Sequence, residues 1–233
     1  TTKTETVNGQ THTFVYLYNS SGYLERVTKD GATVANYTFD LNGNRLSYSG
    51  ITGGRTATYD AQDRMLTNGN VSYTYNVNGD LESKTEPSGV TTYAYDVLGN
   101  LKSVVLPGGK TIEYIVDDKN RRIGKKVNGV LVKKWVYDGL LKPALEYDGQ
   151  NNVVARYVYG TQINVPEYMV KNGETYRFIT DHLGSVRAVV NTNTGEIVQR
   201  IDYDEYGIVL TDNNPGYTPF GFAGGLYDPE TGL

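Results

Sequence analysis

The chain has 233 residues, with 22 basic and 26 acidic side chains, a net charge of −4, no cysteine and two histidines. This composition excludes disulfide bonds, thiolate catalysis and cysteine-ligated metals, and it lacks the basic surface of a nucleic-acid-binding protein. We therefore expect no cofactor, no metal and no nucleic-acid partner, and because no apolar run approaches about 18 residues we expect no membrane span.

A repeat begins near Tyr16 and continues along most of the chain. Each copy has two aromatic residues two positions apart, then Asp or Asn, and then Gly three positions later. The second aromatic recurs every 16 to 23 residues, a period that indicates one supersecondary unit per repeat. The signature residues are Tyr16, Tyr18, Tyr37, Phe39, Asp40, Gly43, Tyr59, Asp60, Tyr73, Tyr75, Gly79, Tyr93, Tyr95, Asp96, Gly99, Tyr137, Asp138, Tyr157, Tyr159, Tyr203, Asp204 and Gly207.

Each copy has the pattern of a β-hairpin. Residues two apart on a strand point to the same face, so Tyr93 and Tyr95 form an aromatic stripe. The Asp-x-x-Gly spacing favours a turn in which the carboxylate binds backbone amides and the glycine adopts positive φ. Because a lone hairpin is marginal in water, the sequence predicts an all-β array of hairpins that forms a spiralling β-sheet, with the tyrosines in its core.

The predicted array covers residues 1–160, and the repeats degenerate over residues 161–233. The shorter interval between Tyr59 and Tyr75 predicts one trimmed hairpin. We expect a single continuous structural domain, because no linker divides the sequence. We interpret Thr1 and Leu233 as boundaries within a longer protein.

Three motifs in the last 53 residues depart from the simple repeat. They are Asp181-His182-Leu183-Gly184-Ser185-Val186-Arg187, Tyr203-Asp204-Glu205-Tyr206-Gly207, and Tyr227-Asp228-Pro229-Glu230-Thr231-Gly232-Leu233. Together with Tyr93 to Leu101, which matches the Tyr-Asp repeat most fully, they make the chain resemble the Rhs or YD-repeat family over nearly its full length. The residues that carry the later part of this resemblance are Asp181, His182, Gly184, Arg187, Tyr227, Asp228, Pro229 and Gly232.

The resemblance implies a segment of a YD-repeat shell, similar to the C components of Tc toxins and to the teneurins. It implies a secreted or bacterial cell-surface protein whose shell encloses a C-terminal toxin or effector domain. The partners of the chain would then be adjacent repeats and the enclosed domain of its own polypeptide.

Two groups of residues invite a catalytic interpretation. Rhs shells commonly end in a self-cleaving aspartyl element, and Asp228-Pro229 resembles its motif with one residue too many before the glycine. Asp228 would need a second carboxylate, for which Asp202, Asp204 and Glu205 are candidates by proximity in sequence alone. Asp181, His182 and Ser185 share one strand and turn, where their side chains point in different directions, so we expect a capped turn rather than a hydrolase triad. We expect this fragment not to be an enzyme.

Three alternatives to a shell segment remain open. Exposed tyrosines could make the chain an adhesion or carbohydrate-binding module, and unpaired strand edges could add to another copy and produce homo-oligomers. The third alternative is self-cleavage at Asp228. Burial of the tyrosines would separate the first alternative from a structural role.

Overall fold

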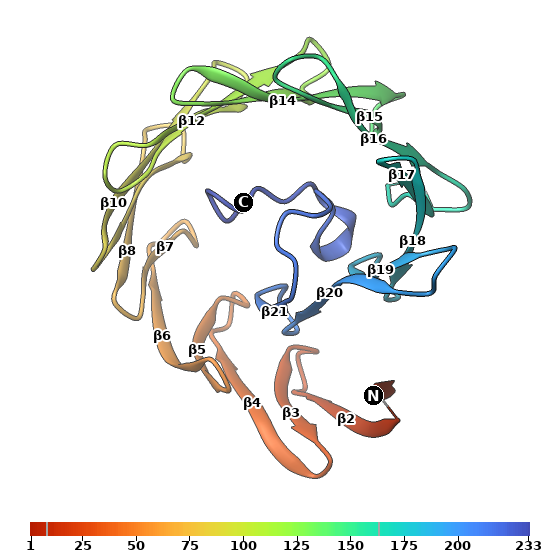
Figure 1. The fold of residues 1–233 in the computed structure, drawn as a ribbon. Coiled ribbons are helices and arrows are strands. Elements are labelled where there is room, and N and C mark those ends of the chain that lie inside the picture. The colour runs from red at the N-terminus through yellow and green to blue at the C-terminus, as the bar shows by residue number, and fades with distance from the viewer. Residues whose placement is uncertain (8, 163) are drawn as a thin grey trace. The chain divides into compact units, whose positions relative to one another are not determined.

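The computed structural model describes residues 1–7, 9–162 and 164–233, with the side chain of Val7 left out. It contains 21 β-strands and a single turn of 3-10 helix, η1 (Phe222–Gly224), and the described residues include no α-helix. The predicted all-β sheet of consecutive hairpins is confirmed (Figure 1). Among the described residues, no helix is long and apolar enough to cross a membrane.

Two compact units divide the chain, Thr1–Val90 (unit 1) and Thr91–Leu233 (unit 2). The strands of unit 1 pair antiparallel in the order of the sequence. They are β1 (Thr2–Val7), β2 (Gln10–Tyr18), β3 (Leu24–Lys29), β4 (Ala32–Phe39), β5 (Arg45–Gly50), β6 (Gly53–Tyr59), β7 (Met65–Asn68), β8 (Val71–Tyr75) and β9 (Leu81–Glu86).

Unit 2 continues the same antiparallel pattern from β10, which begins at the boundary between the units. Its strands are β10 (Gly89–Tyr95), β11 (Leu101–Val105), β12 (Thr111–Val116), β13 (Arg122–Val127), β14 (Val130–Asp138), β15 (Lys142–Asp148), β16 (Val153–Val158), β17 (Tyr168–Lys171), β18 (Glu174–Thr180), β19 (Val186–Asn191), β20 (Ile197–Tyr203) and β21 (Val209–Asp212). The short interval between Tyr59 and Tyr75 corresponds to β7 and β8, which have four and five residues.

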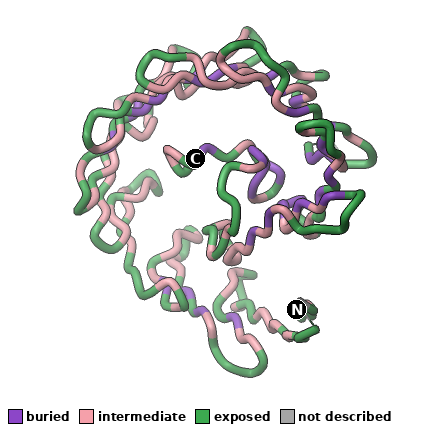
Figure 2. The backbone as a smooth tube through the Cα atoms, viewed as in Figure 1, coloured by how far each residue is buried: buried purple, intermediate pink, exposed green. Residues whose placement is uncertain are grey.

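The core of each unit lies on one face of its sheet, because side chains alternate between the two faces. In unit 1 the buried cluster contains Val27, Ala35, Tyr37 and Tyr48. In unit 2 a larger cluster includes Tyr157, Met169, Phe178 and Val189, and Phe220 of the segment that follows β21 packs against it. Figure 2 shows buried residues along the strands of unit 2 and in this segment.

The segment from Asn213 to Leu233 lies against the core face of the unit 2 sheet, which curves around it (Figure 1). It contains η1 and otherwise only an isolated bridge between Phe220 and Leu226. We call residues 213–233 the inner segment. It brings the Tyr227-to-Leu233 motif onto strands more than a hundred residues earlier in the chain.

Candidate functional site

The turns of the repeat have the geometry that their spacing predicts. Oδ1 of Asp96 accepts hydrogen bonds from the amides of Leu98 at 2.9 Å and Asn100 at 3.0 Å. The amide of Asn100 holds the pKa of Asp96 below its ordinary value, and Gly99 has φ of +80°. The same pair of side-chain bonds forms at Asn19, Asp40, Asp60, Asn76, Asp117, Asp148, Asp181 and Asp204. Asp138 instead lies in β14, paired with Lys142.

A β-bulge precedes the second aromatic residue of the repeat. The register shifts between Thr58 and Tyr59, for example, so that Tyr59 pairs with Met65. The carbonyl of Met65 then accepts a hydrogen bond of 2.8 Å from the hydroxyl of Tyr75 in the next repeat. Three further tyrosines bind a carbonyl at the preceding bulge: Tyr59 binds Arg45, Tyr137 binds Arg122 and Tyr159 binds Pro143.

Both aromatic positions of the repeat are at least half-buried in most copies. The first tyrosine is buried at Tyr37, Tyr93 and Tyr157 and half-buried at Tyr16 and Tyr73, and the second is half-buried at Tyr59, Tyr75 and Tyr159. Tyr18 is an exception, with 52% of its surface exposed. Most signature tyrosines therefore serve the core and the ladder between repeats, which leaves little aromatic surface for a carbohydrate-binding role.

The inner segment is anchored to unit 2 first by aromatic packing. The ring of Phe220 meets the rings of Tyr157 and Phe178 edge-on, with centroids 5.0 and 5.9 Å apart. Phe220 and Val165 are almost completely buried. Edge-to-face pairs of this kind add about 0.5–1.5 kcal/mol each beyond the burial of apolar area.

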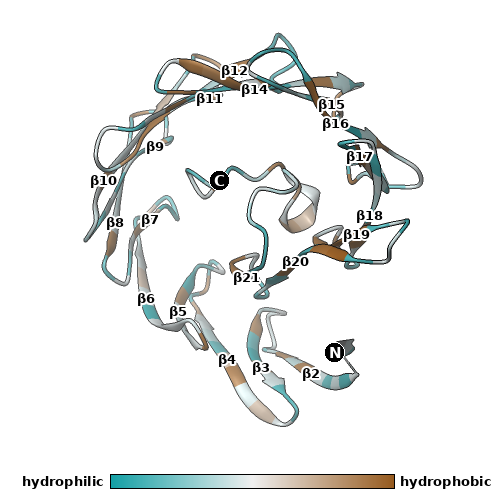
Figure 3. Ribbon diagram, in the orientation of Figure 1, coloured by the Kyte–Doolittle hydropathy of each residue, from teal (hydrophilic) through white to brown (hydrophobic). Residues whose placement is uncertain are grey.

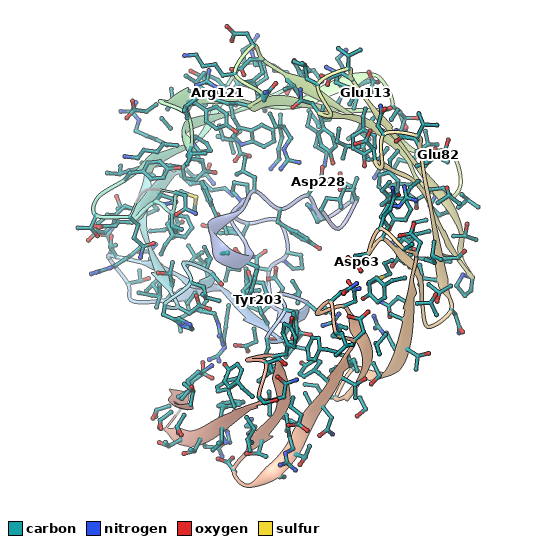
Figure 4. All side chains as sticks on the ribbon, turned by 180° about the vertical axis from the view of Figure 1, so that it is seen from behind. Asp63, Glu82, Glu113, Arg121, Tyr203 and Asp228 are labelled. Atoms are coloured by element: carbon teal, nitrogen blue, oxygen red, sulfur yellow. The ribbon has the colours of Figure 1, made fainter. Side chains whose placement is uncertain are left out.

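A buried ionic cluster forms the second anchor. Nζ of Lys125 on β13 lies 2.6 Å from Oδ1 of Asp228, and the hydroxyl of Tyr114 on β12 donates to Oδ2 of Asp228 at 2.8 Å. Lys125 also binds the carboxylate of Glu230. Lys125 and Asp228 are 5% and 3% exposed, so the pair is withdrawn from water. Figure 4 shows Asp228 on the inner side of the unit 2 sheet.

Backbone contacts complete this anchor. The guanidinium of Arg122 donates to the carbonyl of Leu226 at 2.9 Å, and the Tyr227 amide donates to the carbonyl of Pro219 at 2.8 Å. The amide of Gly232 donates to the carbonyl of Asp228 at 2.8 Å and closes the turn around Pro229. We call the set of Tyr114, Lys125, Asp228 and Glu230 the ionic anchor.

The electrostatics of the ionic anchor favour an ionised Asp228. Burial alone raises the pKa of this carboxyl, but the hydrogen bonds that Lys125 and Tyr114 donate to it outweigh burial and hold the pKa below its ordinary value. Burial raises the pKa of Tyr114 to about 12, so its hydroxyl remains a donor. An aspartate that acts as an acid at neutral pH would need the opposite shift.

Two of the three carboxylates predicted near Asp228, Asp202 and Asp204, bind elsewhere. Asp202 binds Arg187 at 2.6 Å, and it also interacts with Arg200 and Thr211. Asp204 caps its own turn. The second carboxylate at Asp228 is Glu230, and Lys125 bridges the two acids. This arrangement suits a clamp rather than two acids that share a proton.

The Asp181-to-Arg187 motif also has a structural arrangement. Asp181 caps the amides of Leu183 and Ser185, and His182 is exposed at this turn. Oγ of Ser185 is buried and accepts a hydrogen bond of 3.0 Å from the amide of Ala223, which links the motif to the inner segment. These three side chains do not form a triad. Within residues 1–7, 9–162 and 164–233 no cluster of three or more His, Asp and Glu side chains could hold a metal ion.

The partners of Asp228 could not be identified from the sequence. Lys125 lies in a run of basic residues, a pattern typical of the solvent-facing side of a strand. Tyr114 and Asp228 are 114 positions apart in the sequence. One signal pointed to Lys125. It pairs with Tyr114 across β12 and β13, so both side chains lie on the face of the sheet that carries the buried residues.

The Teneurin YD-shell family profile matches residues 1–233. Teneurin-1 of Gallus gallus is 28% identical over 226 residues, which cover 94% of this chain and 8% of that protein. The tRNA nuclease WapA of Bacillus subtilis (strain 168) is 31% identical over 230 residues, which cover 93% of this chain and 9% of that protein. A chain in the Photorhabdus luminescens Tc holotoxin pore aligns with a TM-score of 0.42 and 12% identity, covering 94% of this chain and 16% of its own length.

The chain thus spans less than a tenth of the curated relatives that it matches. The resemblance to YD-repeat proteins that the Tyr-Asp motifs indicate is confirmed, and the role of the chain is that of a structural shell segment. The chain belongs to the teneurin YD-shell family.

Proposed function

We propose that the chain is wall of a shell that encloses a further, C-terminal domain of its own polypeptide, a toxin or effector, in a secreted or surface-located bacterial protein. The observation that carries this proposal is the inner segment. The core face of unit 2 already receives polypeptide from later in the same chain, bound by rings and by the ionic anchor.

The relatives support the proposal. The WapA relative is called a tRNA nuclease, and about nine tenths of its length lies outside the region that matches this chain. If the nuclease activity of that relative resides outside the matched region, the matched region is free to form the wall of a shell. The ion pair with Lys125 makes Asp228 an anchor of the inner segment, which also supports a wall role.

Limited proteolysis of the full-length parent protein tests enclosure. We expect the region after residue 233 to resist a protease that digests the same region when it is expressed alone. Equal digestion rates for the isolated and the full-length forms would contradict enclosure.

Self-cleavage is tested by intact mass. The parent protein and its Asp228→Asn variant are purified side by side. A product that ends near Leu233 in the parent and is lost in the variant would make Asp228 catalytic and overturn its assignment as an anchor. We expect no product that depends on Asp228.

A further inference from the structure

The outward face of the unit 2 sheet differs from the outward face of the unit 1 sheet. From β4 to β9 of unit 1, three cross-strand pairs on this face are hydroxyl pairs: Thr38 with Ser47 at 2.6 Å, Thr58 with Thr67 at 2.6 Å, and Thr74 with Ser83 at 2.7 Å. Such pairs are what a sheet face in contact with water ordinarily shows. They provide an internal reference for an uncovered surface of this repeat.

On β14–β20 many of the corresponding positions carry apolar side chains. The registers place Val136 beside Leu145, Val158 beside Tyr168, and Val190 beside Ile197 on the face opposite the core. Five of the aliphatic residues keep 36% to 51% of their surface exposed: Val136, Val158, Val170, Ile179 and Ile197. We call Val136, Leu145, Val158, Tyr168, Val170, Ile179, Val190 and Ile197 the aliphatic face. Figure 3 shows hydrophobic residues along these strands.

Two arginines lie among the aliphatic side chains of β15–β19, and the outward carboxylate of Asp202 on β20 is paired with Arg200. Arg156 lies between Leu145 and Val170, and Arg177 lies between Tyr168 and Val190. Both arginines are exposed. Along β15–β19, all of whose residues the structure describes, Glu146, Asp148 and Glu174 pair on the core face, and no carboxylate occupies an outward position.

We propose that the aliphatic face is the docking surface for a polypeptide partner that presents aliphatic side chains flanked by carboxylates. Contiguous exposed apolar patches with a polar rim mark interaction sites on soluble proteins. A buried aliphatic centre supplies affinity, and Arg156 and Arg177 select the charge of the partner and accelerate its association.

Charge also separates this partner from the other occupants of such a surface. A second copy docked face to face would bring the arginines of one protomer toward those of the other. Binding to anionic lipid typically uses clusters of four to eight basic residues. Arg156 and Arg177 lie within the aliphatic face, whereas Lys134 and Arg200 at its two ends are bound to Asn151 and Asp202. An acidic, aliphatic polypeptide matches both features of the face.

The test uses two synthetic amphipathic helical peptides of about 20 residues. Both have the same stripe of leucines, and the positions that flank this stripe are Glu in one peptide and Lys in the other. Binding to the 233-residue chain is measured by fluorescence anisotropy at two salt concentrations. We expect the Glu peptide to bind at least about tenfold more tightly than the Lys peptide, with a difference that shrinks in high salt. Equal binding of the two peptides, or binding of neither, would overturn the proposal.

Variants separate the two components of the surface. Val158→Thr with Ile179→Thr introduces the residue type that unit 1 carries on this face and should weaken the Glu peptide at least about tenfold. Arg156→Gln with Arg177→Gln keeps the aliphatic residues and should remove the preference for Glu over Lys. Val97→Thr makes the same exchange at a fully exposed turn and should change nothing. An unchanged preference in the arginine variant would contradict the assignment.

Two further measurements report on the other occupants. If vesicles containing anionic lipid bind the chain while the Glu peptide does not, the face is a membrane surface and the proposal is wrong. If light scattering shows a dimer that Val158→Thr dissociates, the occupant is a second copy and the proposal is also wrong. We expect neither result.

Discussion

At the scale of single residues, the hydroxyl of the second tyrosine distinguishes the repeat from a simple apolar pattern. A β-bulge disrupts the ladder and leaves a backbone carbonyl to be satisfied. The hydroxyls of Tyr59 and Tyr75 bind the carbonyls of Arg45 and Met65 in the preceding repeat. The second tyrosine therefore buries its ring and also makes a hydrogen bond to the neighbouring hairpin. This double role explains why tyrosine is so frequent in the chain.

Replacing Tyr75 by Phe tests this role. The ring remains, but the carbonyl of Met65 loses its donor at 2.8 Å. We expect a loss of about 1 kcal/mol in the free energy of unfolding, measured by urea denaturation. Tyr18→Phe changes a ring that is 52% exposed and serves as the control, with a change of less than about 0.5 kcal/mol. Equal effects of the two substitutions would contradict the hydrogen-bond role.

The turn glycines give a second prediction at this scale. Gly99 has φ of +80°, and a Cβ added there would meet no atom within 4 Å. Gly99→Ala should therefore cost about 1 kcal/mol of unfolding free energy through backbone strain alone. Gly54→Ala in β6 is the matched control, because its added Cβ comes no closer than 3.8 Å to Tyr48 and its φ is not positive. A neutral Gly99→Ala variant would show that the turn relaxes.

At the scale of elements, the sequence predicts what is local and misses what is distant. The spacing of two in Tyr93 and Tyr95 identifies a strand face, and Asp96 with Gly99 identifies the turn, because both depend on residues a few positions apart. The bulges are not visible, since they depend on the register between two strands. Lys125 and Asp228 are in contact although they are 103 positions apart in the sequence. The residues around Lys125 indicate a solvent-facing strand, and those around Asp228 indicate a loop motif. That part of the site required the fold.

The ionic anchor gives the prediction at this scale. Lys125→Ala leaves the carboxylate of Asp228 buried without its cation, and breaking a buried pair in this way costs about 3–5 kcal/mol. We expect the inner segment to exchange its amide hydrogens much faster in this variant, while the strands β17–β19 keep their protection. Hydrogen–deuterium exchange measures both in one experiment.

The control for this experiment removes the carboxylate of Asp228 together with the ammonium group of Lys125. Lys125→Met combined with Asp228→Asn should recover much of the protection that Lys125→Ala loses, because it leaves no buried charge unpaired. If both variants release the inner segment equally, the anchor depends on shape at this position, and the ionic interpretation is wrong.

At the scale of the whole molecule, two groups of the ionic anchor, Asp228 and Tyr114, set the pH range over which the inner segment stays bound. Hydrogen bonds at Asp228 hold its pKa below the ordinary value despite burial, so its contribution is present above about pH 4 and is lost as the pH falls through the lower folded value. Burial raises the pKa of Tyr114 to about 12, so its contribution is present below about pH 10 and is lost as the pH rises toward 12.

We therefore expect the protection of the inner segment against proteolysis to be constant between about pH 5 and pH 9, where neither group titrates in the folded or the unfolded chain. Protection should fall below about pH 4 and above about pH 10. Asp228→Asn should flatten the acid limb and Tyr114→Phe the alkaline limb, since each removes one titrating group. A loss of protection between pH 5 and 7 would mean that a group outside the ionic anchor controls the inner segment, because the carboxylate and the phenol that hold it are both outside their titration range there.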